Sequence, residues 1–237
     1  TFRIITYCIE TQIGLYCINK LIETYIEDNK MTDTSLHKDL QNNIIKLNSG
    51  LQMVHHPLYV GTYTGHSFLN DMINNSYKYK KEKFQKYHEQ QNIESLIFLI
   101  ERPFRVTSTK EVLQDWWKPT KEEYWNLISW LWQDTENVYE NLDTWIELLN
   151  LEFSDPQMMM NEKERKVYDN LPDTVTIYRG GIDDKGLSWS LSKETAEWFA
   201  NRFNKGYQVF TKDISKSQIL AYLDGRKEKE IIFNVDY

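Results

Sequence analysis

The chain has 237 residues, of which 41% are hydrophobic and 27% are charged, and this length suffices to bury a substantial core in one or two domains. Its formal net charge of −7 argues against a general nucleic-acid binder, because phosphate contacts require a basic surface. No apolar run approaches the roughly 20 residues that a membrane-spanning helix needs, so no membrane partner is expected.

The N-terminal part is predicted to be mainly helical. Apolar side chains recur at three- and four-residue steps between residues 4 and 25, which is the pattern of a helix with one buried stripe. A shorter helix is expected over residues 36–51. Proline and glycine then break the helical pattern, so residues 58–63 are expected to form a loop or a short strand.

Residues that commonly bind metals do not gather in the sequence. Cys8 and Cys17 are the only cysteines and form no CxxC motif, which indicates a reducing, cytoplasmic setting and no disulfide framework. His55 and His56 are adjacent, so their side chains diverge, and no carboxylate lies at ligand spacing beside them. We therefore expect no metal.

Residues 71–91 are predicted to form a long, lysine-rich helix. Lysine and tyrosine alternate between Tyr77 and His88, a pattern that could hold a nucleic-acid strand by charge and stacking. We interpret the run as a solvated helix face, so a nucleic-acid partner is not expected. The apolar run 96–100 is too short to assign to helix or strand, and Pro103 ends it.

Residues 109–150 are rich in tryptophan and are expected to form three helices. The first closes at Pro119, and the second opens with Thr120 as N-cap and Glu123 three residues later, the spacing of a capping box. The third is expected over residues 135–151. Tryptophans at helical spacing indicate a core, so we predict a helical, Trp-rich domain over residues 1–155.

Residues 156–237 are predicted to form a second domain, because alternation replaces helical periodicity there. A strand over residues 174–179 ends at Gly180 and Gly181, where the backbone can approach a ligand closely. Arg179 at the end of that strand is suited to hold a phosphate by a two-pronged hydrogen bond. The alternative interpretation is that Arg179 is simply an exposed side chain at the end of the strand.

The next strand, over residues 186–191, is expected to carry two hydroxyl groups on one face. Side chains alternate along a strand, so Ser188 and Ser190 share a face while Trp189 points into the core. Ser192 is a suitable N-cap for a helix that begins directly after this strand. The positive end of that helix would favour an anion nearby.

Three further strands are expected over residues 207–211, 218–223 and 230–235. If the last strand starts early, Glu228 and Glu230 project from one face, with Lys227 and Lys229 on the other. Two carboxylates so close repel each other, which raises the pKa of the more buried one. Considered alone, the four residues are an ordinary charged strand edge.

In this order, the three motifs resemble the Arg-Ser-Glu branch of the ADP-ribosyltransferase superfamily. The matching residues are Tyr178-Arg179-Gly180, Ser188-Trp189-Ser190 and Glu228-Lys229-Glu230. The amino-acid sequence of residues 174–237 also resembles uncharacterised phage-encoded members of this superfamily. The resemblance implies an α+β fold, with a mostly helical N-terminal part packed on a small C-terminal β-sandwich.

The resemblance also implies binding of NAD⁺ and cleavage of its nicotinamide–ribose bond, with no metal. It implies that Arg179 and Gly180 hold NAD⁺, and that Ser188 and Ser190 position the nicotinamide ribose. Glu230 would stabilise the oxocarbenium-like charge, and Glu228 would orient or deprotonate the acceptor. Trp189 is expected in the core, with stacking on nicotinamide as its alternative role.

Three functions therefore stay open. The first is a mono-ADP-ribosyltransferase that modifies a protein side chain, with arginine as one option, in the cytoplasm of a phage host. The second is an NAD⁺ glycohydrolase that uses water as acceptor. The third is a binding module that keeps the fold without turnover, although none of the three motifs lacks its Arg, Ser or Glu.

Overall fold

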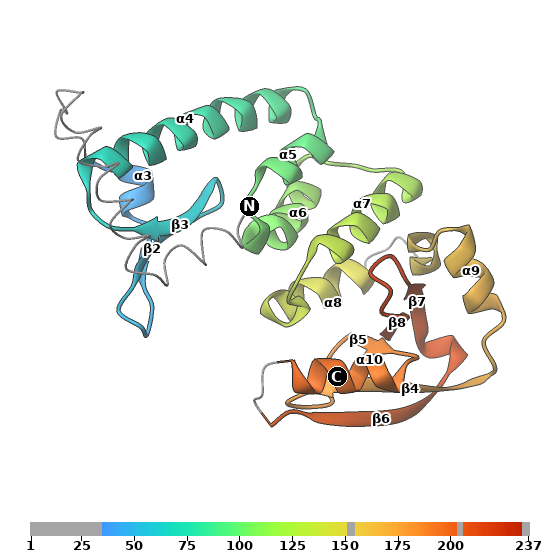
Figure 1. The fold of residues 1–237 in the computed structure, drawn as a ribbon. Coiled ribbons are helices and arrows are strands. Elements are labelled where there is room, and N and C mark those ends of the chain that lie inside the picture. The colour runs from blue at the N-terminus through green and yellow to red at the C-terminus, as the bar shows by residue number, and fades with distance from the viewer. Residues whose placement is uncertain (1–34, 151–154, 203–205, 234–237) are drawn as a thin grey trace. The chain divides into compact units, whose positions relative to one another are not determined.

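The computed structural model describes residues 35–150, 155–202 and 206–233 (Figure 1). The helix predicted over residues 4–25, with Cys8 and Cys17, lies outside this range. Over the described residues the fold is α+β, with eight α-helices and two antiparallel sheets, neither closed into a barrel. These residues fall into two compact units: one runs up to Asn92 and includes Leu99–Glu101, and the other combines Ile93–Phe98 with everything from Arg102 onward. The predicted boundary at residue 155 falls inside the second unit.

The first unit contains a three-stranded meander where a helix was expected. Its elements are α3 (Lys38–Gln41), β1 (Ile44–Lys46), β2 (Gln52–His56), β3 (Tyr59–Tyr63) and α4 (Ser67–Glu89), and the strand order is β1-β2-β3. The helix predicted over residues 36–51 is therefore wrong beyond its first turn. Asn42 caps α3, and the β-branched pair Ile44 and Ile45 then gains a cross-strand partner in β2.

Five helices precede the large sheet in the second unit. They are α5 (Ile93–Leu99), α6 (Arg102–Asp115), α7 (Lys121–Asp134), α8 (Leu142–Asn150) and α9 (Glu162–Asp169), with short 3₁₀ turns at Val138–Asn141 and Pro156–Met159. The capping box that opens α7 at Thr120 is confirmed. The expected tryptophan core is confirmed too, since the buried Trp132 and Trp145 rings meet edge to face with centroids 4.9 Å apart.

The second sheet has five strands in the order β6-β4-β5-β8-β7. Its strands are β4 (Thr174–Gly181), β5 (Ser188–Ser190), β6 (Gln208–Ser215), β7 (Ile219–Leu223) and β8 (Glu230–Phe233). All five were predicted, and β6 extends four residues further than expected, to Ser215. Helix α10 (Lys193–Asn201) follows β5 directly, with Ser192 as its N-cap as predicted.

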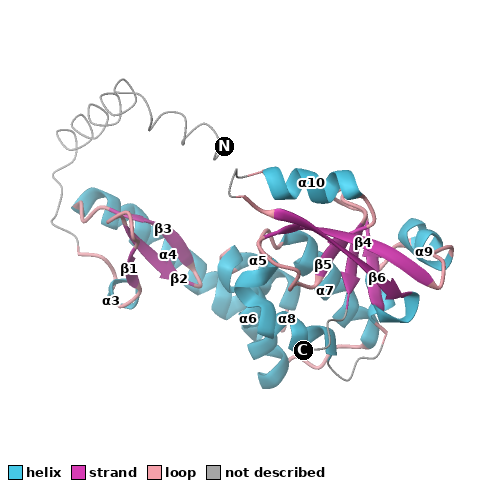
Figure 2. Ribbon diagram, turned by 90° about the horizontal axis from the view of Figure 1, so that it is seen from below, coloured by secondary structure: helices cyan, strands magenta, loops and turns pink. Residues whose placement is uncertain are grey.

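Helix α10 packs closely on β4, as Figure 2 shows. A Cβ atom on Gly180 would lie 2.0 Å from the backbone oxygen of Ala196 and 2.6 Å from the backbone nitrogen of Ala200. Only glycine permits this approach at position 180. The close approach fixes α10 beside the end of β4 that carries Arg179.

Candidate functional site

A cavity of about 440 Å³ opens in the second unit, where β4, β5, α10, the loop before β8 and the end of α7 meet. All seven site residues predicted from the sequence line it, namely Arg179, Gly180, Ser188, Trp189, Ser190, Glu228 and Glu230. Its charged side chains are three arginines and three glutamates: Arg179, Arg202, Arg226, Glu136, Glu228 and Glu230. The cavity therefore offers positive groups for phosphates and negative groups for a developing positive charge.

The register of the sheet brings the hydroxyl strand and the acidic strand together. Ser190 pairs with Tyr178 of β4 on one side and with Glu230 of β8 on the other. Directly paired residues of antiparallel strands project from the same face, and Ser188 shares the face of Ser190. Accordingly, the Ser188 hydroxyl donates a hydrogen bond to Oε1 of Glu230, across 42 positions of sequence.

Glu230 is the buried carboxylate of the site. The residue is only 4% exposed, and its Oε2 accepts a hydrogen bond from Nη2 of Arg226 at 2.9 Å. Each carboxylate oxygen thus has one protein donor, Ser188 on one side and Arg226 on the other. A carboxylate offers about four lone-pair directions, so Glu230 retains capacity to accept a hydroxyl group of a ligand.

Glu228 lies in the turn before β8 and not on the strand, so the expected strand face shared with Glu230 is wrong. Lys227 and Lys229 have positive φ values of 59° and 47°, which bends the chain on either side of Glu228. Burial raises the pKa of Glu228, and the neighbouring Glu230 raises it further, whereas Arg226 acts in the opposite direction. Glu228 therefore favours its protonated form more than an exposed glutamate does.

Ser190 holds this turn in place. Its hydroxyl donates to the backbone carbonyl of Glu228 at 2.7 Å and accepts from the backbone nitrogen of Ser192 at 2.9 Å. The side chain is thus committed to the backbone on both sides. Of the two predicted serines, Ser188 therefore contacts the Glu230 carboxylate, and Ser190 positions the segment that carries Glu228.

Arg179 lies against the start of β5. Its Nη1 donates to the backbone carbonyl of Ser188 at 2.7 Å. A Cβ atom on Gly186 would come within 2.6 Å of the guanidinium carbon, so glycine there makes room for the arginine. Arg179 therefore holds the start of β5 by a hydrogen bond and also lines the cavity.

Trp189 belongs mainly to the core. The residue is 2% exposed, its indole nitrogen donates to the Gly186 carbonyl at 2.8 Å, and its ring meets Phe233 edge to face. These contacts explain the placement of the indole without a ligand, in line with the core interpretation of the sequence.

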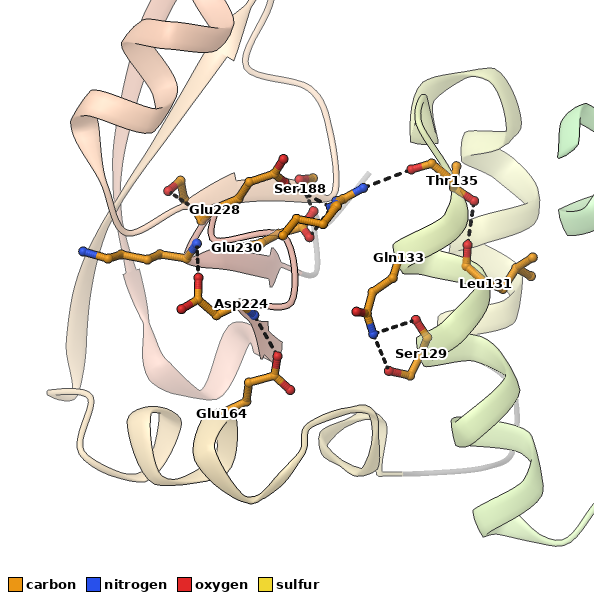
Figure 3. Close-up of polar contacts among 12 residues, drawn as sticks. Ser129, Leu131, Gln133, Thr135, Glu164, Ser188, Asp224, Glu228 and Glu230 are labelled. Atoms are coloured by element: carbon orange, nitrogen blue, oxygen red, sulfur yellow. Dashed lines mark hydrogen bonds and ion pairs between the residues drawn. The ribbon is translucent and has the colours of Figure 1, made fainter. Parts of the chain in front are cut away.

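The sequence analysis missed Arg226, which joins the two carboxylates to helix α7. Figure 3 shows Glu228, Glu230 and Ser188 on the sheet side, facing Thr135 and Gln133 of the α7 end. Arg226 bridges this space, with Nε 3.2 Å from Glu228 and Nη1 donating to the Thr135 carbonyl at 3.2 Å. The only sequence signal was an arginine two positions before the first glutamate.

The loop that carries Arg226 is anchored at its base. The Asp224 backbone nitrogen donates to the buried Glu164 carboxylate at 2.8 Å, and an Asp224 carboxylate oxygen accepts from the Lys229 nitrogen at 3.0 Å. The other Glu164 oxygen accepts from the Asn161 nitrogen in the capping box of α9. One carboxylate therefore ties α9 to the loop.

Among the residues with described positions, no group of three or more His, Cys, Asp or Glu side chains is arranged to hold a metal ion. Within those same ranges, none of the helices combines the length and apolar character needed to cross a bilayer. Comparison of the chain with protein-family models, curated proteins and solved structures finds no match.

Proposed function

We propose that the second unit is an ADP-ribosyltransferase-like domain that binds NAD⁺ in this cavity and cleaves its nicotinamide–ribose bond. One observation carries the proposal: the Ser188 hydroxyl donates to the buried carboxylate of Glu230 in a cavity that Arg179 also lines. These are the Arg, Ser and Glu of the three sequence motifs, and they share one cavity although 51 positions separate the first from the last.

The chemistry follows from the placement of charge. As nicotinamide leaves, positive charge develops at the ribose C1 and its ring oxygen, as in glycoside hydrolysis. A buried carboxylate interacts with that charge more strongly than an exposed one, because little water screens it. Ser188 and Arg226 fix the orientation of Glu230 before the substrate arrives. Arg179 supplies a permanent positive charge for the diphosphate.

Glu228 is suited to act on the acceptor. It lies beside Glu230 on the same Arg226 guanidinium, and burial raises its pKa. A carboxylate with a raised pKa is a stronger base when ionised, so it can take a proton from an attacking nucleophile. The acceptor is a protein side chain in a transferase and water in a glycohydrolase, and the same residues support both reactions.

The test is release of nicotinamide from labelled NAD⁺, with and without a cell lysate as a source of acceptors. Glu230→Gln keeps the shape and removes the charge, so it should lower the rate of release by about 10²–10³, the usual effect of losing one electrostatic stabiliser. Glu147→Gln, which removes an exposed glutamate on α8 that is paired with Lys110, is the matched control. Equal release by wild type and Glu230→Gln, or none by either, would refute the proposal.

A further inference from the structure

The two carboxylates of the site share a positive partner that the chain itself supplies. Nε of Arg226 contacts Glu228 and Nη2 donates to Glu230, while Nη1 donates to the carbonyl of Thr135. Thr135 is the C-cap of α7, where the helix dipole adds negative potential. Each of the three guanidinium nitrogens therefore has an oxygen partner, Nη1 and Nη2 through hydrogen bonds and Nε through an ion pair.

The loop backbone keeps Arg226 in this position. A Cβ atom on Gly225 would lie 2.4 Å from the side-chain oxygen of Gln133, so the loop passes close to α7 directly before Arg226. Directly after it, Lys227 adopts a positive φ of 59°, a conformation that few non-glycine residues adopt. The Gly225 contact and the bend at Lys227 thus hold the backbone of Arg226 beside the end of α7, within reach of both carboxylates.

We propose that the nucleophile accepted at this site is uncharged, namely water or a hydroxyl group, because Arg226 already fills the cation position beside Glu228. This inference rests on the proposed function, since it concerns the second half of the same reaction. An acceptor guanidinium or ammonium group would have to displace Arg226 from two hydrogen bonds and an ion pair, or lie beside its like charge. A neutral hydroxyl meets neither obstacle.

The step is balanced with an uncharged acceptor. The attacking oxygen forms a bond to ribose C1, the bond from C1 to the nicotinamide nitrogen breaks, and its electron pair leaves with neutral nicotinamide. The proton of the attacking oxygen passes to the Glu228 carboxylate and then to solvent. With water as acceptor the products are ADP-ribose, nicotinamide and one proton.

The first experiment tests the cation position without any turnover. Arg226→Gln removes the guanidinium, and its melting temperature is measured with added ethylguanidinium or propylammonium at equal ionic strength. Ethylguanidinium should raise the melting temperature of this variant, because its guanidinium group can bind where the Arg226 guanidinium was. Propylammonium should raise it less, because an ammonium group does not match the planar geometry of that position. Wild type and Arg165→Gln should show no such rise, because Arg165 lies on α9 and hydrogen-bonds to Gln157, and neither residue lines the cavity.

Arg226→Lys is the variant to use if Arg226→Gln does not fold. Lysine keeps the positive charge but lacks the planar guanidinium group that contacts several acceptors at once. Ethylguanidinium should stabilise this variant more than wild type. An equal rise in wild type and in the Arg226 variants would show that the cation position is open in the native protein, and would overturn the inference.

The second experiment measures products from NAD⁺ in the presence of agmatine, a small guanidinium acceptor. Wild type should form ADP-ribose and almost no ADP-ribosyl-agmatine, whereas Arg226→Gln should raise the ratio of the agmatine product to ADP-ribose about tenfold or more. ADP-ribosyl-agmatine as the main wild-type product would overturn the inference. Absence of nicotinamide release in wild type would instead refute the proposed function, and the melting measurement would still decide whether Arg226 fills a guanidinium site.

Discussion

Replacing Gly180 by alanine should loosen the contact that fixes helix α10 beside the cavity. The new Cβ would lie 2.0 Å from the backbone oxygen of Ala196, whereas real Cβ atoms essentially never come closer than 3.0 Å to a neighbour. Both contacting atoms belong to the helix backbone, so no side chain can rotate away. Strand β4 and α10 must therefore separate by roughly 1 Å, the difference between these two distances.

The size of the effect follows from the cost of overpacking, which is about 1–3 kcal/mol for such insertions. For a chain of this size each kcal/mol lowers the melting temperature by about 2–4 °C, so Gly180→Ala should melt about 2–12 °C below wild type. Gly181→Ala is the matched control, because its Cβ would meet no atom closer than 3.6 Å. Its melting temperature should stay unchanged or rise slightly, since alanine restricts the unfolded chain.

The assay is thermal unfolding followed by circular dichroism, with both variants measured under identical conditions. If the two glycine variants melted within about 1 °C of each other, the close packing of α10 on β4 would be contradicted. The placement of α10 as one side of the cavity would then be contradicted as well.

Two further expectations concern pH. Hydrogen bonds from Lys81 and then Tyr77 lower the pKa of Asp39 from 3.8 to about 2, so its contribution to stability is complete above pH 3.8 and is lost as the pH falls towards 2. Urea unfolding of Asp39→Asn should show a weaker acid dependence in that window, and an unchanged dependence would contradict the assignment. Nicotinamide release should lose activity as acid protonates Glu228, with a midpoint above pH 4.5, and Arg226→Gln should move this midpoint higher because Arg226 lowers the pKa of Glu228. A wild-type midpoint at or below 4.5 would argue against Glu228 as the base.

The sequence was informative where structure depends on near neighbours. The capping box at Thr120 and the N-cap at Ser192 were predictable because each involves hydrogen bonds within three residues. The start of β4 was predictable because its side chains alternate between buried and exposed, whereas β7 and β8 were predictable as short apolar runs that are buried almost throughout. The seven candidate site residues came from their order along the chain, and all of them line one cavity.

The sequence was misleading where distant partners decide the local conformation. Residues 44–46 form a strand and not a helix because β2 offers hydrogen bonds and side-chain contacts to them. Glu228 lies in a turn because Lys227 and Lys229 adopt positive φ values, which sequence patterns do not favour for lysine.

Periodicity thus distinguished the Trp-rich helices from the strands that follow them, and the order of polar residues showed which three motifs the chain carries. Only the tertiary structure decided that Ser188 contacts Glu230, that Ser190 holds a turn, and that Arg226 joins both carboxylates to the end of α7. The physical reason is distance along the chain. The Arg226 guanidinium meets a carbonyl 91 positions earlier, and no local pattern encodes a contact that folding creates between such remote segments.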